Sequence, residues 1–402
     1  MLARTFRLTR LFSQKQVLVE RPVQQYEIPT WHLEDISNRP GPISKNDLLK
    51  FTEDGYLLVR GIFPDSEMDA CKRGVDELTT VVADALKAAG KITNTHEGVC
   101  WLQRLILIEE QFQGASVLFH KLGYMHDSFV DIYQNKDLLD VMYQTGLGPT
   151  IAAHPVWNLR TKIPKHSETT VPWHQDNSYV PPDTWHEKVM AAWIPLVPVN
   201  ETNGCMEYIK GAHLTGKTAR HTLCEGNTWY TELSDEEIAK TLYPKGNFSQ
   251  DLKQTVPCGP GDAIVFGPAN PHRSLPNKSD HVRWSLDLRY HSVNPDRKNP
   301  LDMFYGVKES LILRKEGEPD FVPDWTSWKG TNPLEAERAT TLKGNDGIHG
   351  HRGMTDDEID TVIVGNWMDL WDITAPTNKH IEKYMQANGL WEKVQADLSK
   401  GK

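Results

Sequence analysis

The sequence predicts an α+β protein in which a strand-rich middle is flanked by helices. Apolar residues recur at the spacing of one helix face between residues 66 and 87. After Gly148 the pattern changes to short extended pieces separated by proline and glycine, which is typical of a β-sandwich or β-barrel. Helical spacing returns after Thr355. These three observations divide the chain into a folded unit, 26–295, and a following segment, 296–402.

Composition excludes several classes of protein. The chain has 402 residues, of which 39% are hydrophobic and 24% charged, and its formal net charge is −10. No apolar run approaches the ~20 residues that a membrane-spanning helix needs, and no basic stripe in the body of the chain points to nucleic acid. The cysteines form no Cys-x-x-Cys pair, so we expect a reducing compartment and neither a zinc ribbon nor a disulfide framework. They are Cys71, Cys100, Cys205, Cys224 and Cys258.

Residues 1–25 differ from the rest of the chain. They contain several arginines interleaved with leucine and phenylalanine, and no acid occurs before Glu20. This pattern predicts a mitochondrial presequence, with a disordered basic tail on a cytoplasmic protein as an equal alternative. A peroxisomal signal beginning at Arg7 and Leu8 ranks last, because Lys15 stands where that signal has an apolar residue.

The first elements of the folded part are predicted from capping and periodicity. Ser44 and Asp47 suit a capping box, so we expect a helix from Ser44 that Gly55 ends. Residues 56–60 are predicted to form a strand, and 66–87 a second helix. Further helices are expected between residues 129 and 142.

The strand-rich region and the tail follow. Gly259 to Asp262 is a strong turn signal ahead of the strand 263–267. A polar insertion, 214–256, contains one helical stretch at 235–242, and residues 295–350 are expected to be largely irregular. Thr355 and Glu358 predict a capping box for a helix that carries Ile359, Val362, Ile363, Leu370 and Trp371, and a last helix should follow Thr377. The other strands are expected at 151–163, 171–180, 189–197, 205–209 and 282–291.

His174 and Asp176 are the first candidate metal ligands. If their segment is extended, both side chains point the same way and can meet at one ion. Two histidines and one carboxylate on one side of iron(II) leave three positions open. Two other His-x-acid sequences are weaker candidates. His380 precedes Glu382 in a predicted helix, where residues two apart point in different directions, and His32 lies in an irregular segment.

The third ligand has to come from a distant strand, and His272 is the best candidate. Arg283 lies eleven residues further on, a spacing that lets the chain turn and run back. A guanidinium there could pair with one end of a five-carbon dicarboxylate whose other end chelates the metal, and Ser274 could donate to the same carboxylate. The polar face that carries Arg283 either lines a site or is solvated. The competing histidines are His213, His221, His281 and His291.

With these residues in place, the chain resembles the phytanoyl-CoA dioxygenase family of iron(II)- and 2-oxoglutarate-dependent oxygenases over about residues 45–292. The motifs that carry the resemblance are 54–60, 173–176, 203–205 with 211–213, and 261–262 leading to His272, Ser274 and Arg283. The resemblance implies a double-stranded β-helix (jelly-roll or cupin-like) core with flanking α-helices.

The resemblance also implies roles for individual residues. His174, Asp176 and His272 match the iron ligands, and Arg283 matches the residue that binds the distal carboxylate of 2-oxoglutarate, with Ser274 beside it. Trp193 and Asn158 correspond, with less certain alignment, to other positions of the cofactor pocket. His213 matches the histidine of a structural turn, and Lys210 departs from the proline usual there. Relatives that halogenate have a small residue in place of Asp176, so its presence favours hydroxylation.

The expected activity is therefore hydroxylation of an aliphatic C–H in a small-molecule or lipid-like substrate, with release of succinate and CO2. The cofactors implied are Fe(2+), 2-oxoglutarate as co-substrate and O2, with ascorbate as a candidate reductant. An alternative is a non-redox metal enzyme, an isomerase or hydrolase, on a cupin-like barrel. It explains the histidines and the carboxylate but not Arg283 and Ser274. Neither an acyl-CoA nor a free small molecule is excluded as substrate, and the oligomeric state stays open.

Overall fold

The computed structural model describes residues 36–122, 124–223, 228–293, 311–326, 328, 359–374 and 378–392. The segment 1–25, His32, Cys224 and the capping box of Thr355 and Glu358 lie outside this part of the chain. None of the helices in the described ranges is long and apolar enough to cross a bilayer.

The first helix begins and ends where capping predicts, and a strand and a second helix follow it. Helix α1 spans Lys45–Asp54, and the Ser44 side chain accepts a hydrogen bond from the backbone N–H of Asp47. Gly55 ends the helix in the left-handed conformation, with φ 86°. Strand β1, Tyr56–Val59, follows directly, and then helix α2, Asp65–Ala88. The expected apolar face of α2 is confirmed, because Met68, Cys71, Val75, Leu78 and Val82 are all buried.

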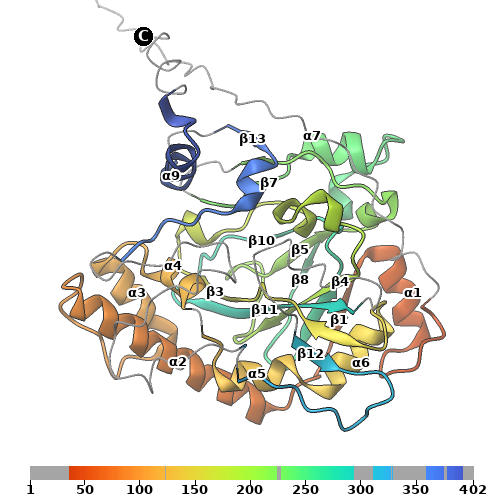
Figure 1. Cartoon of the computed structure of the whole chain (residues 1–402), viewed down its shortest axis with the longest axis horizontal. Coiled ribbons are helices and arrows are strands. Elements are labelled where there is room, and N and C mark those ends of the chain that lie inside the picture. The colour runs from red at the N-terminus through yellow and green to blue at the C-terminus, as the bar shows by residue number, and fades with distance from the viewer. Residues whose placement is uncertain are drawn as a thin grey trace, which may run out of the picture.

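Four more helices complete the amino-terminal part. They are α3 (Trp101–Gln111), α4 (Ala115–Leu118), α5 (Asp127–Tyr133) and α6 (Lys136–Gln144). The expected helices between residues 129 and 142 correspond to α5 and α6. Helices α2, α3 and α5 lie along one side of the strands, as Figure 1 shows.

The larger sheet has seven strands in the described part of the chain, and all its pairs are antiparallel. Its order is β1-β9-β4-β11-β2-β12, with β3 also paired to β11. Its remaining strands are β2 (Ile151–Ala153), β3 (Asn158–Lys162), β4 (Val189–Pro195), β9 (Ala263–Phe266), β11 (Arg283–Ser292) and β12 (Leu311–Arg314). Strand β12 pairs with β2. It lies within residues 295–350, which we expected to be largely irregular, and that expectation is wrong for residues 311–314.

A second antiparallel sheet faces the first. It consists of β10 (His272–Ser274), β5 (Met206–Ile209) and β8 (Lys253–Val256), in that order. Trp193 and Phe266 from the larger sheet share one buried cluster with Met206, Tyr208 and Val256 from the smaller one. The two sheets therefore pack against each other through an apolar layer.

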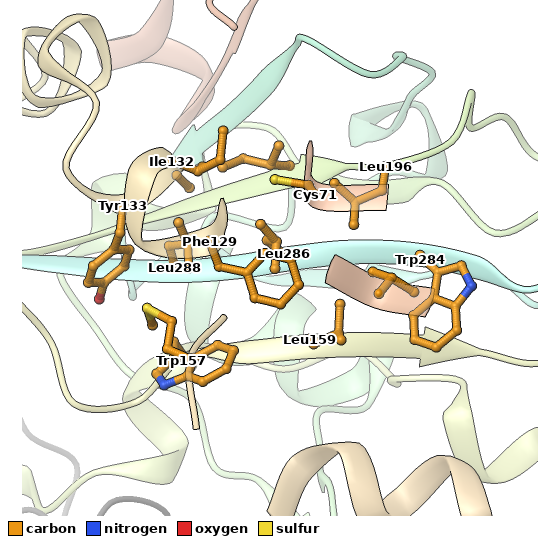
Figure 2. Close-up of a cluster of buried hydrophobic side chains, with 14 of the residues drawn as sticks. Cys71, Phe129, Ile132, Tyr133, Trp157, Leu159, Leu196, Trp284, Leu286 and Leu288 are labelled. Carbon is orange, nitrogen blue, oxygen red and sulfur yellow. The ribbon is translucent and has the colours of Figure 1, made fainter. Parts of the chain in front are cut away.

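Strand β11 separates the hydrophobic core from the polar interior. Trp284, Leu286 and Leu288 point to the side where Phe129 of α5 and Leu159 of β3 pack, as Figure 2 shows. Alternate residues of the strand point to the opposite side, and the whole strand up to His291 is buried. The alternative in which the polar face of this strand is solvated is therefore wrong.

The carboxyl-terminal segment forms a small cluster above the sheets. A short third sheet joins β13 (Asp372–Ile373), β6 (Thr222–Leu223) and β7 (Thr231–Glu232), and helix α9 spans Lys379–Ala387. Helix α9 confirms the expected last helix. The helix expected around residues 359–371 is wrong, because the described chain there is irregular apart from a 3₁₀ turn at Asn366–Asp369. Ile363, Leu370 and Trp371 pack instead in a cluster with Trp185 and Trp229.

Within the insertion 214–256, the expected helical stretch at 235–242 is present, first as an α-helical and then as a π-helical turn. Helix α7 covers Asp235–Glu237 and continues as a π-helical turn at Ile238–Leu242. The expected strand at 171–180 is wrong, because Asp176–Tyr179 forms a 3₁₀ turn and only His174 makes a bridge to another strand.

Candidate metal centre and adjoining cavities

His174 and His272 are brought together by backbone pairing between the two chain segments that carry them. Their backbones exchange hydrogen bonds in both directions, at 3.1 Å and 3.0 Å. His174 is extended, and Asp176 begins the 3₁₀ turn. Gln175 points away from the two ligands, and its side-chain amide donates to the backbone oxygens of Lys217 and Ala269. His174 and Asp176 therefore still meet, although their segment is not a strand.

The three side chains present one open donor atom each to a common point. Their ligand atoms all lie within 4.8 Å of one another. The Nδ1 atoms of His174 and His272 lie 2.9 Å and 3.0 Å from the backbone oxygens of Pro172 and Asn270, so each Nε2 faces inward. Asp176 Oδ1 lies 3.4 Å and 3.8 Å from these Nε2 atoms and has no hydrogen-bond partner among the described residues. This donor set fits a divalent metal ion.

The protonation states suit metal binding. Burial, together with His174, lowers the pKa of His272 to about 3, so its ring stays neutral. Burial alone would raise the pKa of Asp176, but the guanidinium of Arg289 and the two histidines outweigh this effect. They hold the pKa of Asp176 well below its usual range. Metal ligands have to be deprotonated, and His272 and Asp176 meet that condition near neutral pH.

The competing histidines lie elsewhere. His213 bonds the backbone oxygen of Thr52 at 3.1 Å, and His281 lies 3.1 Å from Asp280. His291 packs against His154, with ring centroids 6.4 Å apart. His221 Nε2 accepts the backbone N–H of Gln175 at 3.0 Å, so it supports the ligand loop without joining the donor set.

Asp176 is the first member of a row of side chains that alternate in charge. Arg289 Nε donates to Asp176 Oδ2 at 3.0 Å, and Arg289 Nη2 lies 3.2 Å from Asp287 Oδ2. Arg160 Nη2 donates to the same Asp287 oxygen at 2.9 Å. Arg160, Asp287 and Arg289 point inward from β3 and β11. Sequence reasoning gave them no role, although the alternation along residues 283–290 was its available signal.

A small cavity of about 30 Å³ connects the metal donors to Arg283. His174, His272, Ser274, Trp193 and Arg283 all line it. The Arg283 guanidinium lies 5.2 Å from the ring centroid of Trp193 and donates to Ser285 at 2.6 Å. Its Nε has no hydrogen-bond partner among the described residues. Ser274 Oγ accepts the backbone N–H of Val171 at 3.3 Å, which leaves its hydroxyl hydrogen available.

Lys162 is a second basic side chain in this cavity, and sequence reasoning missed it. It pairs with Arg283 across β3 and β11, it is 1% exposed, and its Nζ has no hydrogen-bond partner in the described part of the chain. Burial, followed by Arg283 and Arg160, lowers its pKa well below the usual value. The same causes, burial and Arg160, lower the pKa of Arg283 to about 9. The available signal was the spacing of Asn158, Arg160 and Lys162, which places all three on one face of a strand.

A larger cavity of about 110 Å³ adjoins the other side of Asp176. Asn158 lines this cavity and not the one that contains Arg283, and its Oδ1 lies 3.1 Å from His120 Nδ1. Its assignment to the co-substrate therefore stays a prediction that the position does not favour. Arg160, Tyr230 and His120 line both cavities and form the partition between them.

Two histidines and a carboxylate, held between a sheet strand and the segment paired with it, form a candidate mononuclear metal site of the facial type, which non-haem iron oxygenases use. Residues 51–285 match the family model described as phytanoyl-CoA dioxygenase (PhyH), which is more than half of the chain. The chain belongs to the phytanoyl-CoA dioxygenase family, as the motifs indicated, and is accordingly an oxidoreductase.

Two curated proteins and one solved structure illustrate what the chain is similar to. The 1-deoxypentalenic acid 11-beta-hydroxylase of Streptomyces arenae is 30% identical over 255 residues, which cover 61% of this chain and 81% of that one. A phytanoyl-CoA dioxygenase domain-containing protein 1 homolog of Caenorhabditis elegans is 18% identical over 260 residues, covering 60% and 88%. Among solved structures, EctD from S. alaskensis with bound Fe is similar at a TM-score of 0.47 and 18% identity, covering 73% and 94%.

Proposed function

We propose that this protein is an iron(II)- and 2-oxoglutarate-dependent dioxygenase that hydroxylates an aliphatic C–H of a small molecule, with release of succinate and CO2. One observation carries the proposal: His174 and His272, two of the three candidate metal donors, share a cavity with two buried basic side chains, Arg283 and Lys162. A non-redox metal enzyme has no need of such a buried cationic pocket beside its metal.

The co-substrate would bind in the small cavity. Arg283 presents a positive charge with no carboxylate in contact, Lys162 can take up a proton when an anion binds beside it, and a dicarboxylate would complement both groups. Trp193 supports the Arg283 guanidinium, and the Ser274 hydroxyl can donate to the same carboxylate. These contacts fix the orientation of the keto-acid end toward His174 and His272.

The three ligands would hold iron(II) on one side and leave positions open on the other. When bound, the iron supplies the activation of O2 that is coupled to oxidation of 2-oxoglutarate. The protein residues hold the reactants, and their burial excludes bulk water from the centre. Asp176 keeps its carboxylate in place through Arg289, which supports hydroxylation over halogenation.

We further propose that the two packed sheets form the double-stranded β-helix implied by the family resemblance. The antiparallel order of both sheets and their shared buried cluster support this topology. The helices α2, α3 and α5 then support the outer face of the larger sheet (Figure 1).

Anaerobic addition of iron(II) and 2-oxoglutarate tests the proposal directly. We expect a weak visible charge-transfer band in the native protein and none in His174→Ala. His281→Ala is the matched control, because that histidine contacts Asp280 outside the metal donors, and it should keep the band. Metal binding without a band and without 2-oxoglutarate binding would rule out the oxygenase and leave the non-redox isomerase or hydrolase.

A further inference from the structure

The segment 359–374 lies beyond the residues that match the family, yet it packs behind the loop that carries His174 and Asp176. Strand β13 at its end pairs in parallel with β6, above the two larger sheets in Figure 1. The Arg220 side chain, just before β6, donates from Nε to Asp372 at 2.9 Å. This pairing brings the ring of Trp371 against His221, with centroids 4.9 Å apart.

Trp371 contacts the ligand loop on both sides of Asp176. Its Nε1 donates to the backbone oxygen of Ser178 at 2.7 Å. Its ring packs on His221, whose Nε2 accepts the backbone N–H of Gln175 at 3.0 Å. Trp371 is 1% exposed, so the surrounding packing fixes its position. One indole therefore holds the backbone after Asp176 directly and the backbone before it through a single ring.

The hydrogen bonds of His221 define its tautomer. Its Nδ1 lies 2.8 Å from the backbone oxygen of Ala219, which can only accept. Burial lowers the pKa of His221 to about 3, although the bond to Ala219 opposes this shift. The ring is therefore neutral at ordinary pH, carries its hydrogen on Nδ1, and offers Nε2 as the acceptor that the N–H of Gln175 requires.

Gln175 extends this connection to the third ligand. Its side-chain amide donates to the backbone oxygen of Ala269 at 2.6 Å. The next residue, Asn270, accepts a hydrogen bond from Nδ1 of His272 at 3.0 Å through its backbone oxygen. The residue that His221 holds thus joins the two chain segments that supply the metal ligands.

A second tryptophan of the same segment reaches His174 through one ring. Trp367 lines the larger cavity beside Asp176, and its ring meets Tyr179 edge-on with centroids 5.6 Å apart. Tyr179 in turn meets the ring of His174 edge-on at 5.5 Å. Both tryptophans therefore contact the ligand loop, and Trp371 does so through a directed hydrogen bond.

We propose that Trp371 is a positioning residue of the metal centre, which holds the loop of His174 and Asp176 in the shape that presents both ligands. Docking of the segment 359–374 and binding of the metal ion are then coupled. Because such coupling is reciprocal, each event stabilises the other. The inference rests on the metal site of the proposed function, but not on the reaction carried out there.

The test replaces the hydrogen bond and keeps the ring. Trp371→Phe still packs on His221 but leaves the buried oxygen of Ser178 without its donor. In the metal-free full chain, amide hydrogen exchange of Gln175, Asn177 and Ser178 should become on the order of tenfold faster, because an unpaired buried acceptor is costly. The Kd for cobalt(II) should rise about tenfold, the lower end of the range for residues that orient ligands.

Reciprocity supplies a readout that a general loss of stability does not reproduce. In the native protein, cobalt(II) should slow amide exchange in the segment 359–374, including Met368 and Leu370, which bond within its 3₁₀ turn. In Trp371→Phe this slowing should be lost. Mass spectrometry of the exchanged full chain measures both the ligand loop and the segment in one experiment.

Trp325→Phe is the matched control. Trp325 is also buried, and its Nε1 donates to Gln134 at 2.8 Å in the core cluster that packs on the other side of β11. This variant loses an equivalent indole hydrogen bond, and it should keep both the native Kd for cobalt(II) and the slowing of the segment.

His221→Phe is a second variant on the same path. It keeps an aromatic ring against Trp371 but removes the acceptor of the Gln175 N–H. It should reproduce the effects of Trp371→Phe, and it provides the test if that protein loses its thermal unfolding transition.

Either of two results overturns the proposal: a Kd for cobalt(II) in Trp371→Phe equal to that of Trp325→Phe, or no effect of cobalt(II) on exchange in the segment of the native protein. These measurements need no 2-oxoglutarate. Coupled cobalt binding without a charge-transfer band from iron(II) and 2-oxoglutarate would contradict the oxygenase alone. The band in a protein whose segment is uncoupled from the metal would contradict the role of Trp371 alone.

Discussion

Arg289 Nε donates to Oδ2 of Asp176 at 3.0 Å and leaves Oδ1 as the one oxygen that faces His174 and His272. The guanidinium thereby determines which carboxylate oxygen is presented to a metal. Arg289 is itself held by Asp287, which also binds Arg160. Asp176, the candidate metal ligand, is thus the end of a chain of alternating charges that runs through β11 and β3.

Replacing Arg289 should weaken metal binding even though it is not a ligand. In Arg289→Ala the Asp176 carboxylate loses its orienting donor, and we expect the Kd for iron(II) or cobalt(II) to rise on the order of 10–100-fold, as for other residues that orient ligands. Arg289→Lys keeps the positive charge but loses the directed hydrogen bond from Nε. Its Kd for the metal should therefore lie between those of the native protein and Arg289→Ala. Anaerobic metal titration with a competing chelator measures the effect.

Arg314→Ala is the control for this series, because Arg314 makes a partly exposed ion pair with Asp140 far from the donors. It should bind metal as the native protein does. A metal affinity of Arg289→Ala equal to that of the control would mean that Asp176 needs no orienting partner.

Arg283→Ala should separate co-substrate binding from metal binding. Removal of one partner of a buried charge pair costs about 2–5 kcal/mol, so 2-oxoglutarate affinity should fall at least on the order of 30-fold. Metal affinity should change little, because Arg283 contacts none of the ligands in the described structure. Calorimetric titration of each ligand provides the comparison, and an equal loss of both affinities would make Arg283 a structural residue.

Binding of 2-oxoglutarate should take up a proton on Lys162. Burial and the neighbouring arginines lower the pKa of Lys162 in the empty cavity, so it is largely deprotonated at a pH where a free lysine is charged. A bound dianion raises that pKa again, and the affinity therefore falls as pH rises.

Calorimetry in buffers of different ionisation enthalpy measures this uptake at constant pH. Lys162→Met keeps the length of the side chain and should remove the uptake while weakening binding. If proton uptake persists in Lys162→Met, another group takes up the proton. Asp287 and Arg160, which also line the cavity, are then the candidates.

Gly204 should be required for the position of Lys162. Its φ is 89°, and a Cβ would lie 2.5 Å from the backbone oxygen of Leu275 and 2.6 Å from Cδ of Lys162. Gly204→Ala should therefore destabilise the fold by more than the ~1–2 kcal/mol of a left-handed non-glycine residue, and it should also weaken 2-oxoglutarate binding.

Gly90→Ala is the matched control, since Gly90 has φ 68° and nothing within 4 Å of the added Cβ. Gly90→Ala should lose only the free energy of unfolding that a left-handed non-glycine residue costs, and its affinity for 2-oxoglutarate should not change. Chemical denaturation and calorimetry of both variants test the difference. Equal effects of the two substitutions would show that the contacts of Gly204 are unimportant.

Local elements were predictable because their signals lie within a few residues. The side chain of Ser44 caps α1, the glycine at 55 ends it, and the apolar spacing of α2 follows directly from the helical repeat. The strands β4, β5, β9 and β11 follow from runs of apolar residues between turn signals. The failures occurred where packing overrides local pattern. Residues 359–371 carry an apolar face but bury it as an irregular segment against Trp229 and Trp185, and residues 171–180 turn at Asp176.

The sequence by itself determined the types of donor, their order and the family, because His174, Asp176, His272 and Arg283 occur in a motif whose spacing is specific. Only the tertiary structure decided that Lys162 joins Arg283, that Arg289 orients Asp176 and that Trp367 lines the adjoining cavity. Lys162 and Arg283 are 121 positions apart along the chain, and Asp176 and Arg289 are 113 apart. Their meeting depends on strand register and on burial across several elements, and no local pattern encodes either one.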